Sequence, residues 1–235
     1  MPERLKAFMA LYSDLPRQGP GTVNSLLNVL DIADPPPLGR VLDAACGSGA
    51  DAETILRALP GVEVIGIDQQ PGFIKAAKAR GLGADFRVGD MLWPDGFFDL
   101  IWCAGAVYFI GLETALAAWR GHLHPGGKIA FSELVWLGEA SAPAKAFWQE
   151  AYPQMDSIHG VTTRIEASGF TLLSVEPLGR QGWEPYYDAL RGNIAKHKGQ
   201  SAEMDAVIAE TEAEIAIFDA HFGEFDYAVY LVEPA

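Results

Sequence analysis

The sequence is short of cysteine. Cys46 and Cys103 are the only two cysteines among 235 residues. Two thiols are too few for a structural zinc site or a metal cluster, so we expect no metal centre. Two buried, unpaired cysteines are typical of a reducing compartment, where free cysteine behaves as a small hydrophobic residue. The sequence therefore favours a cytoplasmic location.

Positive charge and long hydrophobic runs are scarce too. The chain has 17 Lys and Arg against 31 Asp and Glu, a formal net charge of -14. Nucleic-acid binding depends on basic residues that neutralise phosphates, so we expect no nucleic-acid partner. The apolar runs fall short of the roughly 20 residues that span a bilayer, and residues 1–4 lack the apolar core of a signal peptide. We expect no membrane partner, and the sequence leaves the oligomeric state open.

From residue 40 onward, strand patterns alternate with helix patterns, as in a parallel sheet covered on both faces. The predicted fold is α/β, with a Rossmann-like sheet of seven mostly parallel strands. The last strand suits either the sheet edge or an antiparallel position within the sheet. The predicted strands are residues 40–45, 62–67, 84–88, 98–103, 128–135, 170–175 and 227–232, and the main helices are residues 51–59, 71–80, 112–122 and 160–168.

We expect a single domain over residues 1–235. An N-terminal helical cap (1–36) precedes a cofactor-binding core (37–135), and residues 136–235 hold substrate-side insertions and the last strands. Before the last strand, apolar residues recur every three or four positions, which predicts a helix. These residues are Met204, Val207, Ile208, Thr211, Ile215, Phe218 and Phe222. Acids of this helix, Glu214 among them, are interpreted as a solvated face.

The most informative feature is a turn of small residues after the first strand, with an acid after the second. The turn reads Cys46-Gly47-Ser48-Gly49, and Asp68 ends the next apolar run. Small residues let the backbone approach a ligand, and a carboxylate in this place accepts hydrogen bonds from ribose hydroxyls. The pattern predicts a cofactor that contains adenosine.

Two further acids favour a cationic cofactor over a dinucleotide. Asp43 lies within the first strand, where its charge would oppose a pyrophosphate but attract an ammonium group. Asp90 and Met91 follow the third strand, where an acid could accept from an adenine amino group and an apolar side chain could pack on the ring.

With these motifs the sequence resembles the class I S-adenosylmethionine-dependent methyltransferases, of the small-molecule type similar to the ubiquinone and menaquinone biosynthesis enzymes. The resemblance covers residues 40–135. It implies S-adenosyl-L-methionine as cofactor and methyl transfer to a small molecule at nitrogen, oxygen or carbon. The cofactor-binding residues it implies are Asp43, Ala45, Cys46, Gly47, Gly49, Asp68, Gln69, Gly89, Asp90, Met91, Cys103 and Arg17. Ala45 replaces the family's first glycine, and we expect a negative φ there.

The residues that handle the proton are harder to predict, because methyl transfer depends mainly on holding the two reactants in line. We consider Tyr108, Glu133 and His159 as candidate catalytic residues. Aromatic residues of the insertions are interpreted as cap core, although they could also wall an apolar pocket or hold a cation. Two alternatives stay open: a protein that binds S-adenosylmethionine without transferring its methyl group, and an NAD-dependent oxidoreductase.

Overall fold

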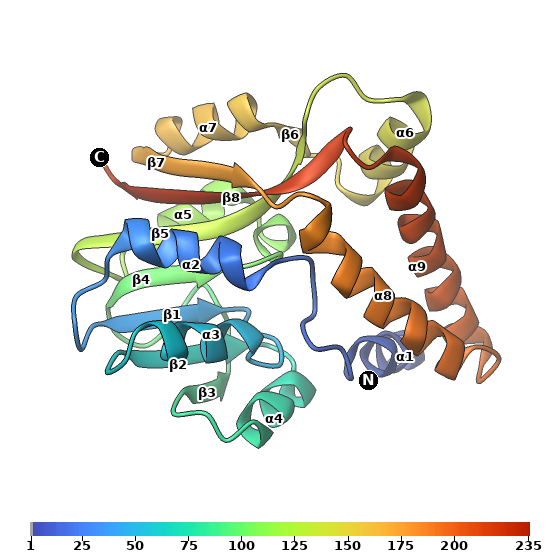
Figure 1. The fold of residues 1–235 in the computed structure, drawn as a ribbon, viewed down its shortest axis with the longest axis horizontal. Coiled ribbons are helices and arrows are strands. Elements are labelled where there is room, and N and C mark those ends of the chain that lie inside the picture. The colour runs from blue at the N-terminus through green and yellow to red at the C-terminus, as the bar shows by residue number, and fades with distance from the viewer. Residues whose placement is uncertain (1) are drawn as a thin grey trace.

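A computed structural model describes residues 2–235, which form one sheet with helices on both faces (Figure 1). The strand order is β3-β2-β1-β4-β5-β8-β7, and the short β6 pairs with β5. The strands are β1 (Arg40–Ala44), β2 (Glu63–Asp68), β3 (Asp85–Val88), β4 (Phe98–Cys103), β5 (Leu123–Trp136), β6 (Asp156–Ser157), β7 (Phe170–Pro177) and β8 (Phe225–Pro234). The predicted α/β fold and its seven strands are confirmed, and the two-residue β6 is an addition.

β8 is antiparallel to both of its neighbours, β5 and β7, while the remaining pairs are parallel. The last strand is therefore inserted within the sheet, one of the two predicted positions. β5 begins earlier than predicted because Leu123 already pairs with Phe98, ahead of a register shift between β4 and β5. The Pro-Gly-Gly segment that we predicted as a turn thus belongs to the start of this strand.

The helices divide between the two faces of the sheet and a cap. They are α1 (Glu3–Tyr12), α2 (Val23–Ala33), α3 (Ala50–Ala58), α4 (Pro71–Ala79), α5 (Leu112–Arg120), α6 (Ala142–Ala151), α7 (Ile158–Ala167), α8 (Arg180–His197) and α9 (Ala202–His221), with a short 3-10 helix at Val107–Phe109. Helices α2, α3 and α4 cover one face, and α5 and α7 cover the other. None of the described helices combines the length and the apolar character needed to cross a membrane.

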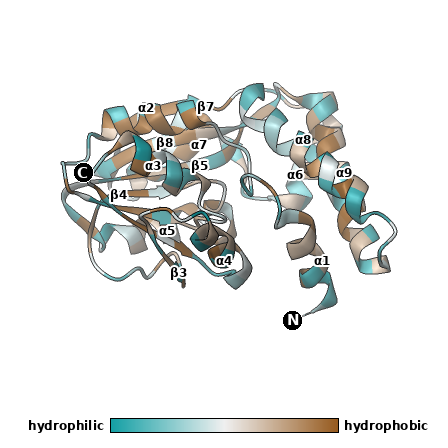
Figure 2. Ribbon diagram, turned by 60° about the horizontal axis from the view of Figure 1, so that its bottom comes forward, coloured by the Kyte–Doolittle hydropathy of each residue, from teal (hydrophilic) through white to brown (hydrophobic). Residues whose placement is uncertain are grey.

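Helix α2 illustrates how the local sequence fixes an element. Thr22, one of two predicted starts, caps the helix by accepting from the amide of Ser25 at 2.9 Å, and the Ser25 side chain accepts in return from the Thr22 amide. This capping box satisfies two of the free amides of the first turn. The apolar residues of α2, brown in Figure 2, pack against the sheet through Leu26 and Leu30.

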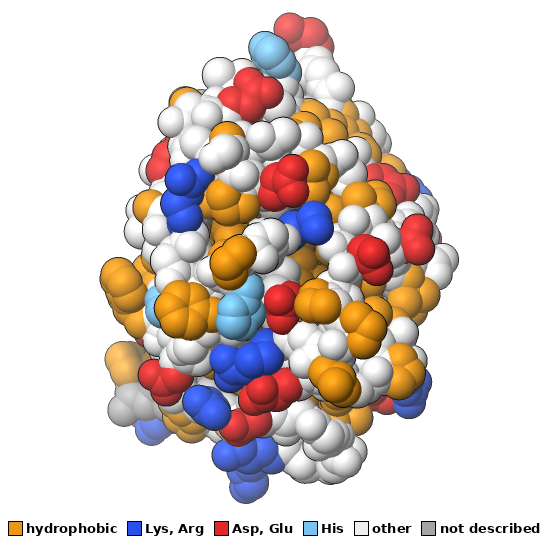
Figure 3. Space-filling view, turned by 90° about the vertical axis from the view of Figure 1, so that its left-hand side faces the viewer, with side chains coloured by type: hydrophobic (Ala, Val, Ile, Leu, Met, Phe, Trp, Pro, Cys, Tyr) orange, Lys and Arg blue, Asp and Glu red, His pale blue; other side chains and the backbone are white. Residues whose placement is uncertain are grey.

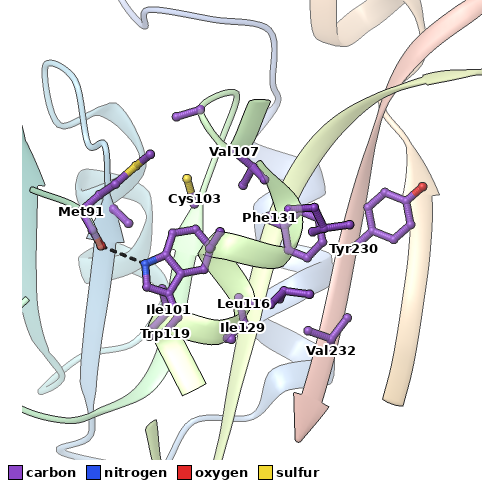
Figure 4. Packing of buried hydrophobic residues seen from close by; sticks show 14 of the residues in the cluster. Met91, Ile101, Cys103, Val107, Leu116, Trp119, Ile129, Phe131, Tyr230 and Val232 are labelled. Atoms are coloured by element: carbon purple, nitrogen blue, oxygen red, sulfur yellow. Dashed lines mark hydrogen bonds between the residues drawn. The ribbon is translucent and has the colours of Figure 1, made fainter. Parts of the chain in front are cut away.

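The core between the sheet and α5 consists of buried apolar side chains. Trp119 is fully buried there, and its indole N–H donates to the backbone carbonyl of Met91 at 2.8 Å (Figure 4). A buried indole needs such a partner, since an unpaired donor costs free energy. Met91 and Cys103 are both members of this core.

Helices α1, α6, α8 and α9 gather beyond the carboxyl ends of the parallel strands, on the right of Figure 1. The predicted apolar stripe of α9 is buried from Met204 to Phe218. Trp183 of α8 stacks on Phe218 with the ring centroids 5.6 Å apart. This cap leaves the opposite end of the sheet uncovered, where charged, histidine and hydrophobic side chains are interspersed (Figure 3).

Candidate functional site

A cavity of about 370 Å³ lies where the carboxyl ends of β1, β2 and β4 meet the cap. The carboxyl edge of an open α/β sheet is where such folds bind ligands. The sheet side contributes Asp43, Ala45, Cys46, Gly47, Ala50, Asp51, Asp68, Ala104, Gly105 and Ala106. The cap side is rich in aromatics and includes Tyr12, Phe73, Tyr108, Trp148, Tyr152, Trp183, Tyr186, Glu214 and Tyr227. The cavity thus has a polar half and an aromatic half.

The glycine-rich loop after β1 needs its glycines for conformation and for space. Gly47 and Gly49 have φ values of 52° and 81°. A Cβ at Gly49 would also lie 2.8 Å from the ring of Phe86. Glycine adopts such left-handed conformations without steric cost. The loop therefore brings its backbone to the cavity, as its small residues predict.

The backbone conformation of Ala45 differs from the predicted one. We expected a negative φ, but the observed φ is 58°. The chain turns sharply here, since the amide of the next residue, Cys46, donates back to the carbonyl of Ile67 on β2 at 3.0 Å. A left-handed alanine costs roughly 1–2 kcal/mol, because its Cβ approaches the following carbonyl oxygen. The alanine is therefore a strained residue in the wall of the cavity.

Asp68 ends β2 at the cavity and is held by two backbone amides. Gly47 donates to one carboxylate oxygen at 3.0 Å and Gln70 to the other at 2.8 Å. A carboxylate offers about four acceptor positions, so two remain for a ligand. Burial raises the pKa of Asp68, which means that its charge is only partly compensated by these amides. The arrangement suits the two hydroxyls of a ribose.

Asp43 is a second buried acid in the cavity wall. Its side chain is 2% exposed and accepts from the amide of Ala52 at 3.1 Å. Burial, and then the nearby carboxylate of Asp51, raise the pKa of Asp43. A ligand cation would offset this accumulated negative charge. Such a site favours the ammonium group that the sequence predicts there.

Arg17, one of the predicted cofactor-binding residues, has a partner within the protein. Its guanidinium pairs with Asp51 at 2.6 Å. The indole N–H of Trp102 donates to the same Asp51 oxygen at 2.9 Å. Arg17 is thereby engaged by the protein itself, although it still lines the cavity.

Gln18, next to Arg17, is a site residue that the sequence analysis missed. Its side-chain oxygen accepts from the amide of Ser48 at 2.8 Å. The same oxygen would lie 2.5 Å from a Cβ at Gly47, so it packs directly on the glycine-rich loop. Arg80 fastens this arrangement by donating to the backbone carbonyls of Ser48 and Pro16. The segment between α1 and α2 is thus bound over the loop, a long-range contact with no local sequence signal.

Six predicted cofactor residues, Gly49 among them, do not line the cavity in the described structure. Gln69 and Asp90 are exposed, and the Asp90 carboxylate accepts from the amide of Leu92 at 2.9 Å. Met91 and Cys103 belong to the core against α5 (Figure 4). Gly89 remains close to the site, since its amide donates to the backbone carbonyl of Asp68 at 3.1 Å. The contact of Asp90 and Met91 with an adenine ring stays a prediction.

The aromatic half of the cavity contains Tyr108, as predicted. Tyr108 follows β4, and its ring centroid lies 5.9 Å from that of Tyr152. Burial raises the pKa of Tyr108 and of Tyr152, so both phenols stay protonated at neutral pH. They can therefore donate hydrogen bonds, but neither is a base by itself.

Glu133 lies behind Tyr152, which donates a hydrogen bond to it. Glu133 is 1% exposed, and its second oxygen has no partner among the described residues. Burial raises the pKa of Glu133 to about 7. The third candidate, His159, is exposed on α7 and does not line the cavity, so its predicted role as a base is not supported by its position. Glu133 and Tyr152 thus form a buried hydrogen-bonded pair, of which Tyr152 lines the cavity.

Glu214 corrects a second expectation, because it faces the cavity instead of forming a solvated surface. One oxygen accepts from the hydroxyl of Tyr187 at 2.7 Å, and burial raises the pKa of the carboxyl group. A signal was present in the sequence: Glu214 is three residues after Thr211 and four before Phe218, both on the buried stripe of α9. Residues at these spacings share one face of a helix.

Comparisons with known proteins agree with this geometry. Residues 41–127 match the "Methyltransferase domain" family. A demethylmenaquinone methyltransferase of Deinococcus radiodurans is 31% identical over 174 residues, covering 66% of this chain and 72% of that protein. A demethylmenaquinone methyltransferase of Thermus thermophilus is 37% identical over 102 residues, which cover 40% of this chain and 46% of that protein. The match thus spans about half the length of the Thermus relative.

The whole fold also resembles a solved methyltransferase. The crystal structure of a SAM-dependent methyltransferase from Geobacter sulfurreducens in complex with S-adenosyl-L-homocysteine superposes with a TM-score of 0.85. The two chains are 20% identical, and the superposition covers 100% of this chain and 99% of the other. The chain belongs to the class I S-adenosylmethionine-dependent methyltransferases. The cofactor of this methyltransferase is S-adenosyl-L-methionine, and the alternative of an NAD-dependent oxidoreductase is set aside.

The residues in the polar half of the cavity fit this cofactor. Asp68 has acceptor positions for the ribose, and the buried carboxylate of Asp43 suits a ligand that carries positive charge. Gly47 and Gly49 present backbone without side chains at the cavity wall or beneath it. S-Adenosylmethionine carries a sulfonium, an ammonium and a carboxylate, so its net positive charge is compatible with the acids of this half.

Proposed function

We propose that this methyltransferase transfers the methyl group of S-adenosylmethionine to a small molecule bound in the aromatic half of the cavity. The observation that carries the proposal is that one cavity joins the glycine-rich loop and Asp68 to the aromatic residues of the cap. Two ligands in one cavity can react directly, whereas separate pockets would keep them apart. The names of the curated relatives, which include methyltransferases of quinone biosynthesis, support a small-molecule acceptor.

In this proposal two acids of the polar half, Asp68 and Asp43, bind the cofactor. Asp68 accepts hydrogen bonds from the ribose hydroxyls, and Asp43 compensates the ammonium group. The bound cofactor supplies an electrophilic methyl group on a positively charged sulfur. Both acids have a raised pKa because of burial, so a bound cation lowers the free energy of their charged forms.

The aromatic half orients the acceptor and excludes water. Tyr108 stands directly after β4, at the boundary between the two halves. Trp183 and Tyr186 of α8 are buried behind it and give the wall a fixed shape. Correct alignment of two reactants can supply several kcal/mol of a barrier, and a dry site prevents competing hydrolysis.

Glu133 and Tyr152 handle the proton that the acceptor loses. The Tyr152 hydroxyl lines the cavity and donates to Glu133. With a pKa of about 7, Glu133 exchanges protons readily at neutral pH. The acceptor proton can pass to Tyr152 while Tyr152 gives its own proton to Glu133. General base action of this kind contributes roughly 10²–10⁴-fold to a rate.

Ala45 favours a second candidate function, a protein that binds the cofactor without transferring its methyl group. The left-handed φ of 58° places a strained alanine where the family usually has glycine. In such a protein the cavity would hold the cofactor for a regulatory or structural purpose. The two candidates differ only in turnover, so binding measurements alone do not separate them.

Two measurements test the proposal. Calorimetric titration with S-adenosylhomocysteine should show binding to the wild type, and the absence of binding would overturn both candidates. Incubation with S-adenosylmethionine and a panel of small amines, phenols and carboxylates should then yield S-adenosylhomocysteine. Tight binding with no turnover on the whole panel would favour the candidate without activity. A cytoplasmic location is part of the proposal, supported by the free, buried Cys46 and Cys103.

A further inference from the structure

We propose that the methyl acceptor is an amine with an apolar body, whose nitrogen binds as an ammonium ion against Glu214. This inference rests on the proposed function and names the substrate class of the same cavity. It starts from the cap, where Glu214 of α9 faces the cavity opposite the glycine-rich loop.

Glu214 differs from its neighbours on α9 in lacking a basic partner. Arg4 pairs with Glu210 at 2.5 Å, Lys198 with Glu212 at 3.4 Å and Arg191 with Asp219 at 2.7 Å. Among residues 2–235, no Lys, Arg or His forms an ion pair with Glu214. Its polar partner is the Tyr187 hydroxyl. Glu214 is half-buried at the cavity wall, and withdrawing a carboxylate from water without a cation beside it is costly, so a positively charged ligand is favoured there.

Tyrosines share the cavity wall with this carboxylate. Tyr12, Tyr108, Tyr186 and Tyr227 line the same cavity as Glu214, and the Tyr187 hydroxyl donates to it. Burial, and then the charge of Glu214, raise the pKa of Tyr12 to about 12, which agrees with this proximity. Tyrosine faces attract cations, and the attraction increases when water is excluded.

The charges of the cavity exclude an anionic acceptor at this end. Of the described residues that line the cavity, Arg17 is the one basic side chain, and it is paired with Asp51. A carboxylate or phosphate next to Glu214 would meet a like charge without a compensating base. A neutral phenol or alcohol could bind to the tyrosines, but it would leave Glu214 uncompensated. An ammonium ion satisfies both the carboxylate and the rings.

The chemistry of methylation is consistent with this position. Glu214 holds the ammonium, which gives one proton through Tyr152 to Glu133, the pair proposed above, and this leaves a neutral amine with a free electron pair. The nitrogen uses this pair to form a bond to the methyl carbon as the carbon–sulfur bond breaks and its electrons stay on sulfur. The product is a methylammonium ion, so the positive charge lost at sulfur appears at nitrogen. Glu133, whose pKa burial raises to about 7, is thus the proton acceptor, and Glu214 is the group that binds the cation.

The test compares two probes of equal shape, 2-phenylethylamine and 2-phenylethanol, titrated calorimetrically into the full chain saturated with S-adenosylhomocysteine. We expect the wild type to bind the amine about tenfold more tightly than the alcohol or better. Glu214→Gln, which keeps an acceptor for Tyr187, should weaken amine binding by about tenfold and change alcohol binding less than about twofold. Glu212→Gln, an exposed acid on the same helix, is the matched control and should leave both unchanged.

The binding results distinguish failure of the amine inference from failure of the proposed function. Equal binding of amine and alcohol by the wild type would overturn the inference, as would tighter binding of phenylacetate or unchanged amine binding in Glu214→Gln. The comparison of amine and alcohol needs no variant, so it decides even if Glu214→Gln does not fold. If S-adenosylhomocysteine binds but the amine does not, the inference fails while the proposed function stands. If S-adenosylhomocysteine itself does not bind, the proposed function fails.

Discussion

The backbone amide of Gly47 donates a hydrogen bond to the carboxylate of Asp68 at 3.0 Å, and this bond joins the loop after β1 to the end of β2. One carboxylate thus shapes the glycine-rich loop and faces the cavity at the same time. Because the second oxygen is held by Gln70 at 2.8 Å, the group has a fixed orientation before any ligand binds. Such preorganisation reduces the entropy lost on binding.

Asp68→Asn tests this double role. The asparagine can accept from only one of the two amides, and it presents an N–H₂ group where the ribose needs an acceptor. We expect the dissociation constant for S-adenosylhomocysteine, measured by calorimetry, to rise by more than about tenfold. Asp85→Asn, on the exposed edge strand β3, is the control and should bind normally. Equal affinities of wild type and Asp68→Asn would show that Asp68 does not hold the ribose.

Ala45→Gly should stabilise the protein. The φ of 58° is strained for alanine and unstrained for glycine, which outweighs the greater flexibility of glycine in the unfolded chain. We expect the free energy of unfolding in urea to rise by about 0.5–1 kcal/mol. Ala44→Gly, one residue earlier in the buried strand β1, should instead lower it. A loss of stability in Ala45→Gly similar to that in Ala44→Gly would contradict the strain at this position.

The fold was predictable where the pattern is local. The buried stripe of α9 is confirmed because it depends on residues within one or two turns of helix. The placement of β8 between β5 and β7 stayed open, because strand order depends on contacts far apart in the sequence. The start of β5 was misplaced since its Pro-Gly-Gly segment resembles a turn, yet it continues the pairing with β4.

The same limit applies to the site. The glycine-rich loop and Asp68 lie on adjacent strands of a recurring motif, so their spacing alone indicates that they meet. Gln18 reaches the cavity from the segment between α1 and α2, and Glu214 reaches it from α9, so both positions depend on how parts outside the core pack. Glu214 was predicted to be exposed because the acids of α9 were assigned together to the solvent-facing side of the helix. The conformation of Ala45 was missed because the sequence gives no sign of a left-handed alanine.

Arg17→Gln tests which carboxylate the guanidinium serves. Since Arg17 pairs with the buried Asp51 at 2.6 Å, the variant should lose about 1–3 kcal/mol of stability in urea unfolding. Of two ligands, S-adenosylhomocysteine carries a carboxylate and 5′-methylthioadenosine does not. If Arg17 serves Asp51 and not the ligand, the variant should weaken the binding of both to the same degree. Arg4→Gln, which removes an exposed ion pair, is the control and should change little. A selective loss of S-adenosylhomocysteine binding would show that Arg17 contacts the cofactor carboxylate.

Glu133 should make the stability depend on pH in a defined direction. Burial raises its pKa from 4.5 to about 7 in the folded protein. Below pH 4.5 the group is protonated in both states; as the pH rises towards 7, only the unfolded state releases the proton, so the free energy of unfolding falls. At about 1.4 kcal/mol for each pH unit, the loss is about 3 kcal/mol.

Glu133→Gln removes this titration. Because other buried acids titrate as well, the quantity to compare is the difference between variant and wild type in urea unfolding at pH 5 and pH 8. The variant should gain about 3 kcal/mol relative to the wild type between these values, whereas the exposed Glu139→Gln should gain nothing. Once a methyl acceptor is identified, the rate of methyl transfer can be measured as well. The wild-type rate should increase with pH through about 7. Glu133→Gln should lose this increase and about 10²-fold or more of the rate. Parallel stability curves would show that Glu133 is already ionised without cost, and a pH-dependent rate retained in Glu133→Gln would assign the proton to another group.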